Sequence, residues 1–416
     1  MKIGMQTYVT KGDIRPFIAL AKGLYEAGHT VTLAYASPEY FDYSKYFDKT
    51  KVRIINASSI ECYREEKNLN KFNPEQLGKY FNDFNKYVYS ASELLCEEND
   101  LVIGNSGAYY LVSYAEKTGT PFVSLSLEHS IIPTKYLPPP GWPGNFGHDY
   151  NLYCWYLISE DVNQKNKEYI NDFRKTLGLP PVKSVFEEIT HSPRLHLIGV
   201  SSVFCQQQPD WENHRYVCGY LFPEDLVDHC LVPEDLKNFI KEGESPVFFS
   251  LGSPYIFINK REKVINTFIE ASKIVGCMAI VQANWDDIDD RLFENSHIYK
   301  IGYNISHKYV FPYCSAVVHD GGAGTTHTAI LCKCPSVVIE YGVDMRFWGA
   351  ELNRIGIAPN LLHGDNLNVE NLVKEISIVL NSKDMKKKAI IYGELMRKEN
   401  SVQKITEILE SHFNTN

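Results

Sequence analysis

The chain has 416 residues, of which 44% are hydrophobic and 22% are charged, as in an ordinary globular protein. This length exceeds what one compact core holds, so two domains of about 200 residues each are expected. Lys and Arg number 42 and Asp and Glu number 51, giving a formal charge of −9, and with no basic block this excludes the nucleic-acid-binding class.

Signals for targeting, membrane insertion and metal binding are weak. Lys11, Gly12 and Asp13 interrupt the N-terminal apolar run before it reaches the length of a signal peptide. No run of about 18 apolar residues occurs, so we expect no membrane-spanning helix. Of the ten cysteines, Cys332 and Cys334 form the one close pair, and no second Cys or His pair stands nearby to complete a zinc site. We therefore expect a cytoplasmic protein with reduced thiols, no metal and no cofactor.

The first half follows the order strand, loop, helix, strand. Residues 2–8 form a short strand-like run, a helical pattern begins at Ile14, and Gly28 ends it before a strand at 30–34. Such units predict a parallel sheet with right-handed crossovers and binding sites at the carboxyl ends of its strands. Further strands are expected at 52–55, 101–103, 122–125, 195–198 and 203–204.

A loop rich in proline and glycine interrupts this half between Pro133 and Gly144. Its three consecutive prolines, which end at Pro140, are incompatible with a helix or a central strand. Trp142 stands beside them. The segment either shapes the wall of a pocket or is a rigid surface loop, and these features alone leave both open.

The second half repeats the α/β order. Polar and acidic residues at 223–243 indicate a linker. The sequence predicts two Rossmann-like domains, 1–222 and 244–385, facing each other across a cleft, with a helix over 386–416 packing back on the N-terminal domain. The strands expected in this half lie at 247–251, 278–282, 298–301, 316–319 and 336–339.

The sharpest local feature is a glycine-rich run that follows an apolar strand, with a helix expected to begin at its threonines. The run is His319, Asp320, Gly321, Gly322, Ala323, Gly324, Thr325 and Thr326. Unpaired amides and the positive end of a helix dipole favour an anion at such a place. The spacing differs from G-x-G-x-x-G, and the lysine of a P-loop is absent. The run indicates a phosphate site; the alternative is a tight turn with threonine caps and no ligand.

Asp13 occupies the matching place in the first half. Directly before a helix that begins at Ile14, it is a good N-cap residue, and position alone favours that role. The competing role is a general base in the cleft between the domains. Structural roles are also favoured for His29, at a helix end, and for the acidic run at 286–290, where a solvated loop competes with a metal site.

In chain order, these motifs resemble those of the nucleotide-sugar glycosyltransferases that modify sterols and glycopeptide or macrolide antibiotics, relatives of the UDP-glucuronosyltransferases. The matching segments are KGDIRPFIALA at 11–21, Pro133-Thr134 with the prolines at 138–140, LGLPP at 177–181, Asp210-Trp211, Gly219-Tyr220, FSLGS at 249–253, 319–326 and GVDMRFWGA at 342–350. The resemblance covers nearly the whole chain.

The resemblance implies a GT-B fold with the acceptor held mainly by the first half and the donor by the second. It gives Asp13 the role of general base in a single inverting displacement, with a nucleotide sugar as co-substrate and an apolar, hydroxyl-bearing small molecule as acceptor. UDP-glucose is the expected donor and a dTDP-sugar the second choice. The expected site residues are Ser253 with 319–326 for the diphosphate, Asp344 and Met345 for the sugar, Trp285 and His307 for the nucleobase, and Gly12, Pro140 and Trp142 for the acceptor.

Two positions depart from the family pattern. Asp320 stands where the family has a histidine that donates to the diphosphate, and a carboxylate there must point away, take up a proton or bridge through a cation. Met345 stands where the family often has glutamine, which removes an amide able to bond the sugar. The alternatives to a transferase are a binding protein that has lost turnover and a nucleotide-sugar epimerase.

Overall fold

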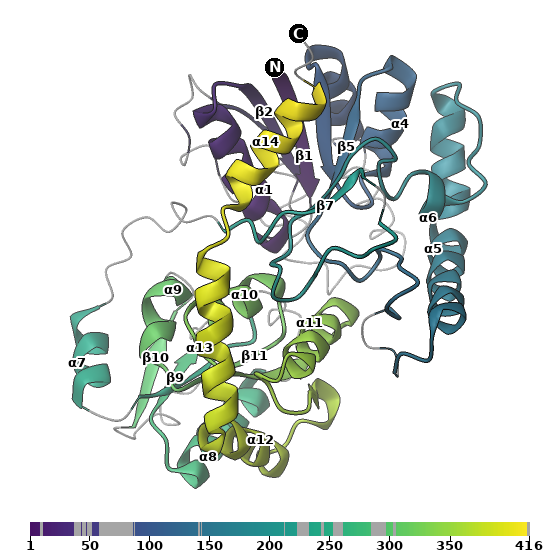
Figure 1. The fold of residues 1–416 in the computed structure, drawn as a ribbon. Helices are drawn as coiled ribbons and strands as arrows, with labels where there is room; N and C mark the ends of the chain where they lie inside the picture. The colour runs from purple at the N-terminus through teal and green to yellow at the C-terminus, as the bar shows by residue number, and fades with distance from the viewer. Residues whose placement is uncertain are drawn as a thin grey trace. The chain divides into compact units, whose positions relative to one another are not determined.

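The computed structural model describes residues 1–8, 11–36, 43, 47, 52–57, 86, 88–139, 142, 144–211, 213–222, 233–242, 245–252, 261–283, 297–302 and 305–413. Pro140, Ser253, Trp285 and the acidic run at 286–290 lie outside these residues. The chain divides into two compact units, coloured along the sequence in Figure 1. Unit 1 comprises Met1–Leu226 and Glu399–Asn416, and unit 2 comprises Val227–Lys398.

Unit 1 is built on a parallel sheet whose seven described strands have the order β3-β2-β1-β4-β5-β6-β7. The strands are β1 Lys2–Tyr8, β2 Thr30–Ala36, β3 Val52–Asn56, β4 Leu101–Asn105, β5 Phe122–Ser126, β6 His196–Ile198 and β7 Arg215–Val217. The helices are α1 Lys11–Glu26, α4 Tyr109–Thr118, α5 His148–Thr176, α6 Val185–Glu188 and α14 Ser401–Phe413. Met5 of β1 pairs with Leu33 on one side and Ile103 on the other. Strand order therefore reverses between β1 and β4, where ligands bind in open α/β sheets.

Unit 2 repeats this arrangement with six described parallel strands in the order β10-β9-β8-β11-β12-β13. The strands are β8 Val247–Phe249, β9 Ala279–Gln282, β10 Ile298–Ile301, β11 Ala316–His319, β12 Ser336–Glu340 and β13 Leu362–His363. The helices are α7 Glu234–Glu242, α8 Arg261–Val275, α9 His307–Val310, α10 Ala323–Leu331, α11 Val343–Arg354, α12 Val369–Asn381 and α13 Lys383–Arg397, with 3-10 turns at Phe311–Tyr313 and Gly364–Asn366. Here the strand order reverses between β8 and β11, so the glycine-rich run follows one of the two strands at that point.

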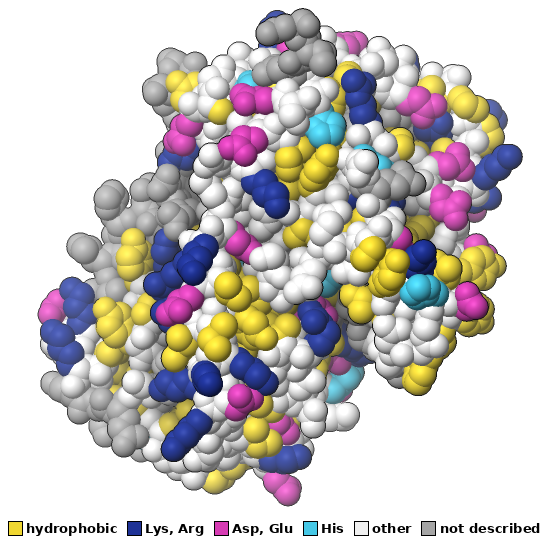
Figure 2. All heavy atoms as spheres, viewed as in Figure 1, with side chains coloured by type: hydrophobic (Ala, Val, Ile, Leu, Met, Phe, Trp, Pro, Cys, Tyr) yellow, Lys and Arg dark blue, Asp and Glu magenta, His cyan; other side chains and the backbone are white. Residues whose placement is uncertain are grey.

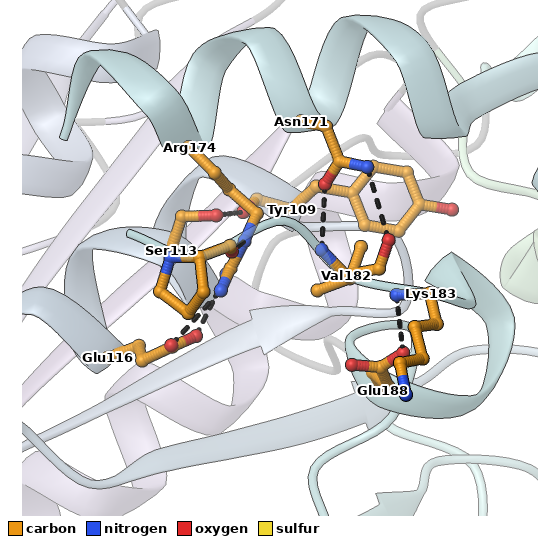
Figure 3. Close-up of polar contacts among 9 residues, drawn as sticks. Tyr109, Ser113, Glu116, Asn171, Arg174, Val182, Lys183 and Glu188 are labelled. Carbon is orange, nitrogen blue, oxygen red and sulfur yellow. Dashed lines mark hydrogen bonds and ion pairs between the residues drawn. The ribbon is translucent and has the colours of Figure 1, made fainter. Parts of the chain in front are cut away.

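An ion pair between the buried Arg174 and the partly exposed Glu116 anchors α5 to α4 in unit 1 (Figure 3). Arg174 is 2% exposed, and its two terminal nitrogens donate to the Glu116 carboxylate at 2.8 and 3.0 Å. Its Nε donates to the Pro180 carbonyl at 3.0 Å. One turn earlier on α5, Asn171 exchanges hydrogen bonds with the backbone of Val182. These bonds hold the loop after α5 on the body of unit 1.

The parallel α/β fold predicted from the sequence is confirmed, and nearly all the expected strands are present within a few residues of their bounds. The strand expected at 203–204 is wrong. The amides of Phe204 and Cys205 both donate to the Ser201 carbonyl, so the chain turns there.

Two segments at the boundary between the units differ from expectation. Part of the expected linker is helix α7, because Leu236, Phe239 and Ile240 are spaced for one helical face and pack into a core cluster of unit 2. The expected helix over 386–416 is two helices, of which only α14 belongs to unit 1. Between them Glu399 accepts hydrogen bonds from Ser201, Ser202 and Tyr220, which holds the break in place.

The surface carries charges of both signs. Lys and Arg are interspersed with Asp and Glu on the face drawn in Figure 2, with a denser basic group over α13, whose sequence contains Lys383, Lys386, Lys387 and Lys388. Within the described ranges, no helix is long and apolar enough to cross a bilayer.

Candidate active site

The glycine-rich turn of unit 2 has a backbone that only glycine tolerates. Strand β11 is buried along its length and runs directly into Gly321, whose φ is +88°. A Cβ atom on Gly321 would lie 2.5 Å from the carbonyl oxygen of Met345, so the turn contacts the start of α11 through its backbone. Helix α10 begins at Ala323, two residues before the start expected at Thr325.

The N-terminus of α10 has polar groups available for an anion. Gly322 is the N-cap and supplies no side-chain cap. The amides of Ala323, Gly324 and Thr325 donate to none of the residues that the structure describes. The buried Thr326 hydroxyl likewise has no hydrogen-bond partner within the described ranges. Free amides and the helix dipole make this place suited to a phosphate group.

His319 supports the turn from inside the core. It is fully buried, and its Nδ1 accepts a hydrogen bond from the Gly321 amide at 3.1 Å. Burial lowers the pKa of His319 to about 3, so the imidazole is neutral and carries its proton on Nε2. This Nε2 has no hydrogen-bond partner among the described residues. His319 was predicted to bind the diphosphate; in the structure its hydrogen bond with the Gly321 amide positions the turn.

Asp320 is almost completely buried, with 2% of its surface exposed. Its Oδ1 accepts a hydrogen bond from the Gly322 amide at 2.9 Å. Its Oδ2 lies against Gly252, just after β8. A Cβ atom placed on Gly252 would lie 2.6 Å from this oxygen. Burial raises the pKa of Asp320 to about 7, although the Gly322 hydrogen bond favours the ionised form. The carboxyl group therefore bridges the ends of the two strands at the reversal of strand order.

A polar network below the turn was not predicted from the sequence. The Gln282 side-chain oxygen accepts from the Ser250 hydroxyl at 2.8 Å and lies 2.8 Å from Nε2 of His307. The His307 ring stacks on Phe311, with ring centroids 4.6 Å apart. His307, predicted near the nucleobase, thus lies at the carboxyl ends of β8, β9 and β10, where the bonds of Gln282 fix its ring. The only sequence signal was a polar residue at the end of each apolar strand.

Helix α11 holds the two residues predicted to contact the sugar. Asp344 is exposed in its first turn, and Gly342 is its N-cap. The Met345 side chain is 7% exposed and belongs to the core, so Met345 meets the glycine-rich turn through its carbonyl oxygen. Of the pair, only Asp344 offers a polar side chain at the surface of the unit.

In unit 1, Asp13 lies in the first turn of α1, because this helix begins at Lys11 and not at Ile14. The proposed N-cap role at Asp13 is therefore wrong. The side chain is half-buried, and the Thr7 hydroxyl donates to its backbone carbonyl at 3.3 Å. The Tyr8 hydroxyl, which has Asp13 among its electrostatic neighbours, donates to the Gly107 carbonyl at 2.6 Å and joins the ends of β1 and β4. Asp13 thus stands at the reversal of strand order in unit 1.

The residues predicted for the acceptor are only partly described. Gly12 is exposed in the first turn of α1. Trp142 is half-buried, and its amide donates to the Pro139 carbonyl at 3.1 Å.

A second unpredicted group lies at the carboxyl ends of β4 and β5. Ser106 bonds to Ser126, and the Ser126 hydroxyl lies 2.6 Å from Nε2 of His196. His196 stacks on His191 with ring centroids 4.4 Å apart, and burial lowers the pKa of His196 well below its usual range. These hydrogen bonds run from the half-buried Ser106 to the buried, neutral imidazole of His196.

Comparisons with known proteins place these features in context. No model of a known protein family matches the chain. A sterol 3-β-glucosyltransferase of Arabidopsis thaliana is 26% identical over 99% of this chain and 68% of its own length. O-mycaminosyltylonolide 6-deoxyallosyltransferase of Streptomyces fradiae is 26% identical over 100% of this chain and 98% of its own length. The chain spans 66% of a second Arabidopsis sterol 3-β-glucosyltransferase and 34% of one from Saccharomyces cerevisiae.

Solved structures show the fold. The calicheamicin glycosyltransferase CalG4 superposes with a TM-score of 0.69 and 13% identity, covering 99% of this chain and 98% of that one. Glycosyltransferase VinC in complex with dTDP superposes with a TM-score of 0.61 and 15% identity over 100% of both chains. The chain is homologous to sterol and macrolide glycosyltransferases and has the GT-B fold, which confirms the resemblance, the fold class and the enzyme class predicted from its sequence.

Proposed function

We propose that this protein is an inverting O-glycosyltransferase that moves a hexose from a nucleotide diphosphate sugar to a hydroxyl group of an apolar small molecule. One observation carries the proposal: buried strand β11 leads through a glycine turn into α10, whose first three amides lack partners among the described residues. A departing diphosphate gains charge and needs fixed donors of this kind. Because the helix terminus supplies them, we expect transfer to proceed in the presence of a chelator.

The reaction is a single displacement. Asp13 accepts the proton of the acceptor hydroxyl, and the oxygen attacks the anomeric carbon from the side opposite the diphosphate. The bond to the diphosphate oxygen breaks as the new glycosidic bond forms, so the anomeric configuration inverts. The amides of α10 stabilise the leaving group, and Asp344 accepts hydrogen bonds from the sugar hydroxyls. Ser253 and Thr325 are expected to add hydroxyl donors to the diphosphate.

The names of the relatives guide the choice of substrates. Glucosyltransferases acting on sterols support UDP-glucose as donor and a sterol as acceptor, and the macrolide enzyme supports a polyketide as the second acceptor class. Because VinC was solved in complex with dTDP, a dTDP-sugar is the second donor that we propose. Flavonoids remain a third acceptor class to screen.

The test is nucleotide release from UDP-glucose and dTDP-glucose, with and without a panel of sterols, macrolide aglycones and flavonoids. Release that requires an acceptor and yields a β-glycoside from an α-linked donor supports the proposal. Donor binding without release under any condition would instead indicate a binding protein, and isomerisation of the donor sugar without an acceptor would indicate an epimerase.

A further inference from the structure

The buried carboxyl group of Asp320 is the feature of unit 2 that the proposed function does not explain. It is 2% exposed and lies between the end of β8 and the glycine turn. Its Oδ1 is bonded to the Gly322 amide, so the carboxyl group does not point away from the turn. Any diphosphate at the N-terminus of α10 must come close to it. The question is which protonation state it has then.

No positive charge faces this carboxyl group within the described residues. From its own strand comes His319, which is neutral because burial lowers its pKa to about 3. Gly252, which follows β8, lies against the carboxyl group and carries no charge. Asp344 on α11 is negatively charged and adds to the effect of burial in raising the pKa of Asp320. His307 on α9 is held by Gln282. Helix α10 contributes only uncharged residues, from Ala323 to Leu331, apart from the buried His327.

A carboxylate at this place would face the donor with like charge. A diphosphate diester carries two negative charges, and in a cleft like charges a few ångströms apart cost several kcal/mol if each stays ionised, roughly. Protonation removes this repulsion and turns one carboxyl oxygen into a hydrogen-bond donor. Burial already brings Asp320 close to that state, because it raises its pKa to about 7.

We propose that the protein binds its donor with Asp320 in the neutral, protonated form, so that donor binding takes up one proton from solvent. Oδ1 keeps its bond from the Gly322 amide. The hydroxyl on Oδ2 donates to a diphosphate oxygen and so performs the task that the resemblance assigns to histidine at this position. This inference rests on the proposed function, since it presupposes a nucleotide-sugar donor.

Calorimetric titration of the full-length protein with UDP-glucose, and separately with dTDP-glucose, tests this in the presence of a chelator. These donors do not titrate near neutral pH, so buffers of different ionisation enthalpy report protons taken up by the protein. We expect uptake approaching one proton at pH about 8, and an affinity that falls roughly fivefold from pH 7 to pH 8 and about tenfold per further unit. Asp320→Asn, which cannot titrate but keeps an amide donor, should show no uptake and an affinity independent of pH.

Asp384→Asn, on the exposed face of α13, is the matched control and should behave like the parent. No proton uptake by the parent, or equal uptake by Asp320→Asn, would overturn the inference. If a chelator weakens donor binding by the parent and Asp320→Asn binds the donor poorly at every pH, a cation bridges Asp320 and the diphosphate instead. Failure of the folded parent to bind either donor would refute the proposed function, and the inference with it.

Discussion

Asp13 and Asp320 each follow a buried parallel strand at the place where strand order reverses, yet their surroundings differ. Asp13 is half-buried in the first turn of α1. Asp320 is enclosed, and burial raises its pKa to about 7. We therefore propose different roles for the same residue type, a general base at Asp13 and a neutral hydrogen-bond donor at Asp320.

Replacing Asp13 by Asn should remove the general base and leave donor binding intact. We expect the rate of transfer to fall by about 10²–10⁴. The Kd for UDP-glucose should stay within about twofold, because no donor contact is assigned to Asp13. Steady-state rates and calorimetry on Asp13→Asn and on the exposed Asp172→Asn measure both quantities. Transfer within a few fold of the parent would leave Asp13 with a structural role only.

Asp320 should also make the stability of the free protein depend on pH. Its folded pKa, about 7, lies above the unfolded value of about 3.9, so the parent loses stability as pH rises from about 4 to 7 and then levels off. The loss is at most about 1.4 kcal/mol per pH unit. Asp320→Asn lacks this loss, so its stability relative to the parent should rise over this range. Urea unfolding at several pH values checks it, and a difference that does not vary with pH would mean that Asp320 is ionised when free.

At the scale of single elements, the turn between β11 and α10 depends on Gly321. Alanine there would need a φ of +88° and would place its Cβ 2.5 Å from the Met345 carbonyl oxygen. Because this oxygen is a backbone atom, it cannot move aside as a flexible side chain could. We expect Gly321→Ala to weaken donor binding about tenfold or more, by moving α11 or the turn. Gly28→Ala in unit 1 is the control, because Gly28 has a similar φ of +90° but no heavy atom lies within 4 Å of the added carbon. Equal donor affinities in calorimetry for the two variants would contradict this account.

The sequence predicted these elements where their apolar residues form a continuous run or recur at helical spacing. Continuous apolar runs located the central strands, since parallel strands are buried on both faces. Helix α7 resembles a linker in sequence because its three apolar residues, at 236, 239 and 240, stand among charged ones. The bond from Ser250 to Gln282 spans 32 residues and that from His307 to Gln282 spans 25, and no local pattern encodes such contacts. The identity of Asp320 was visible, but its burial was not.

At the scale of the whole molecule, both units use one strand order, β3-β2-β1-β4 in the first and β10-β9-β8-β11 in the second. Each carries its candidate residues where that order reverses. The chain returns to unit 1 only at its end, through α14, whose Ile405 and Leu409 are fully buried in the core of that unit. Everything that forms the proposed donor site therefore comes from one continuous stretch of chain.

A fragment covering 227–398 should consequently fold and bind UDP-glucose without unit 1. This range keeps α7, whose Leu236 is fully buried, and α13, whose Gly393 packs against the carbonyl oxygen of Ile330 on α10. A shorter fragment, 244–385, follows the sequence-based boundaries and lacks α7 and nearly all of α13. Its loss of α7 exposes the core cluster in which Leu236 packs with Phe248, and its loss of α13 exposes one side of α10. We expect the longer fragment to unfold cooperatively and to bind donor within a few fold of the parent, and the shorter one to aggregate or bind weakly. Circular dichroism and calorimetry on both decide it, and a folded long fragment that binds no donor would mean that unit 1 contributes essential contacts.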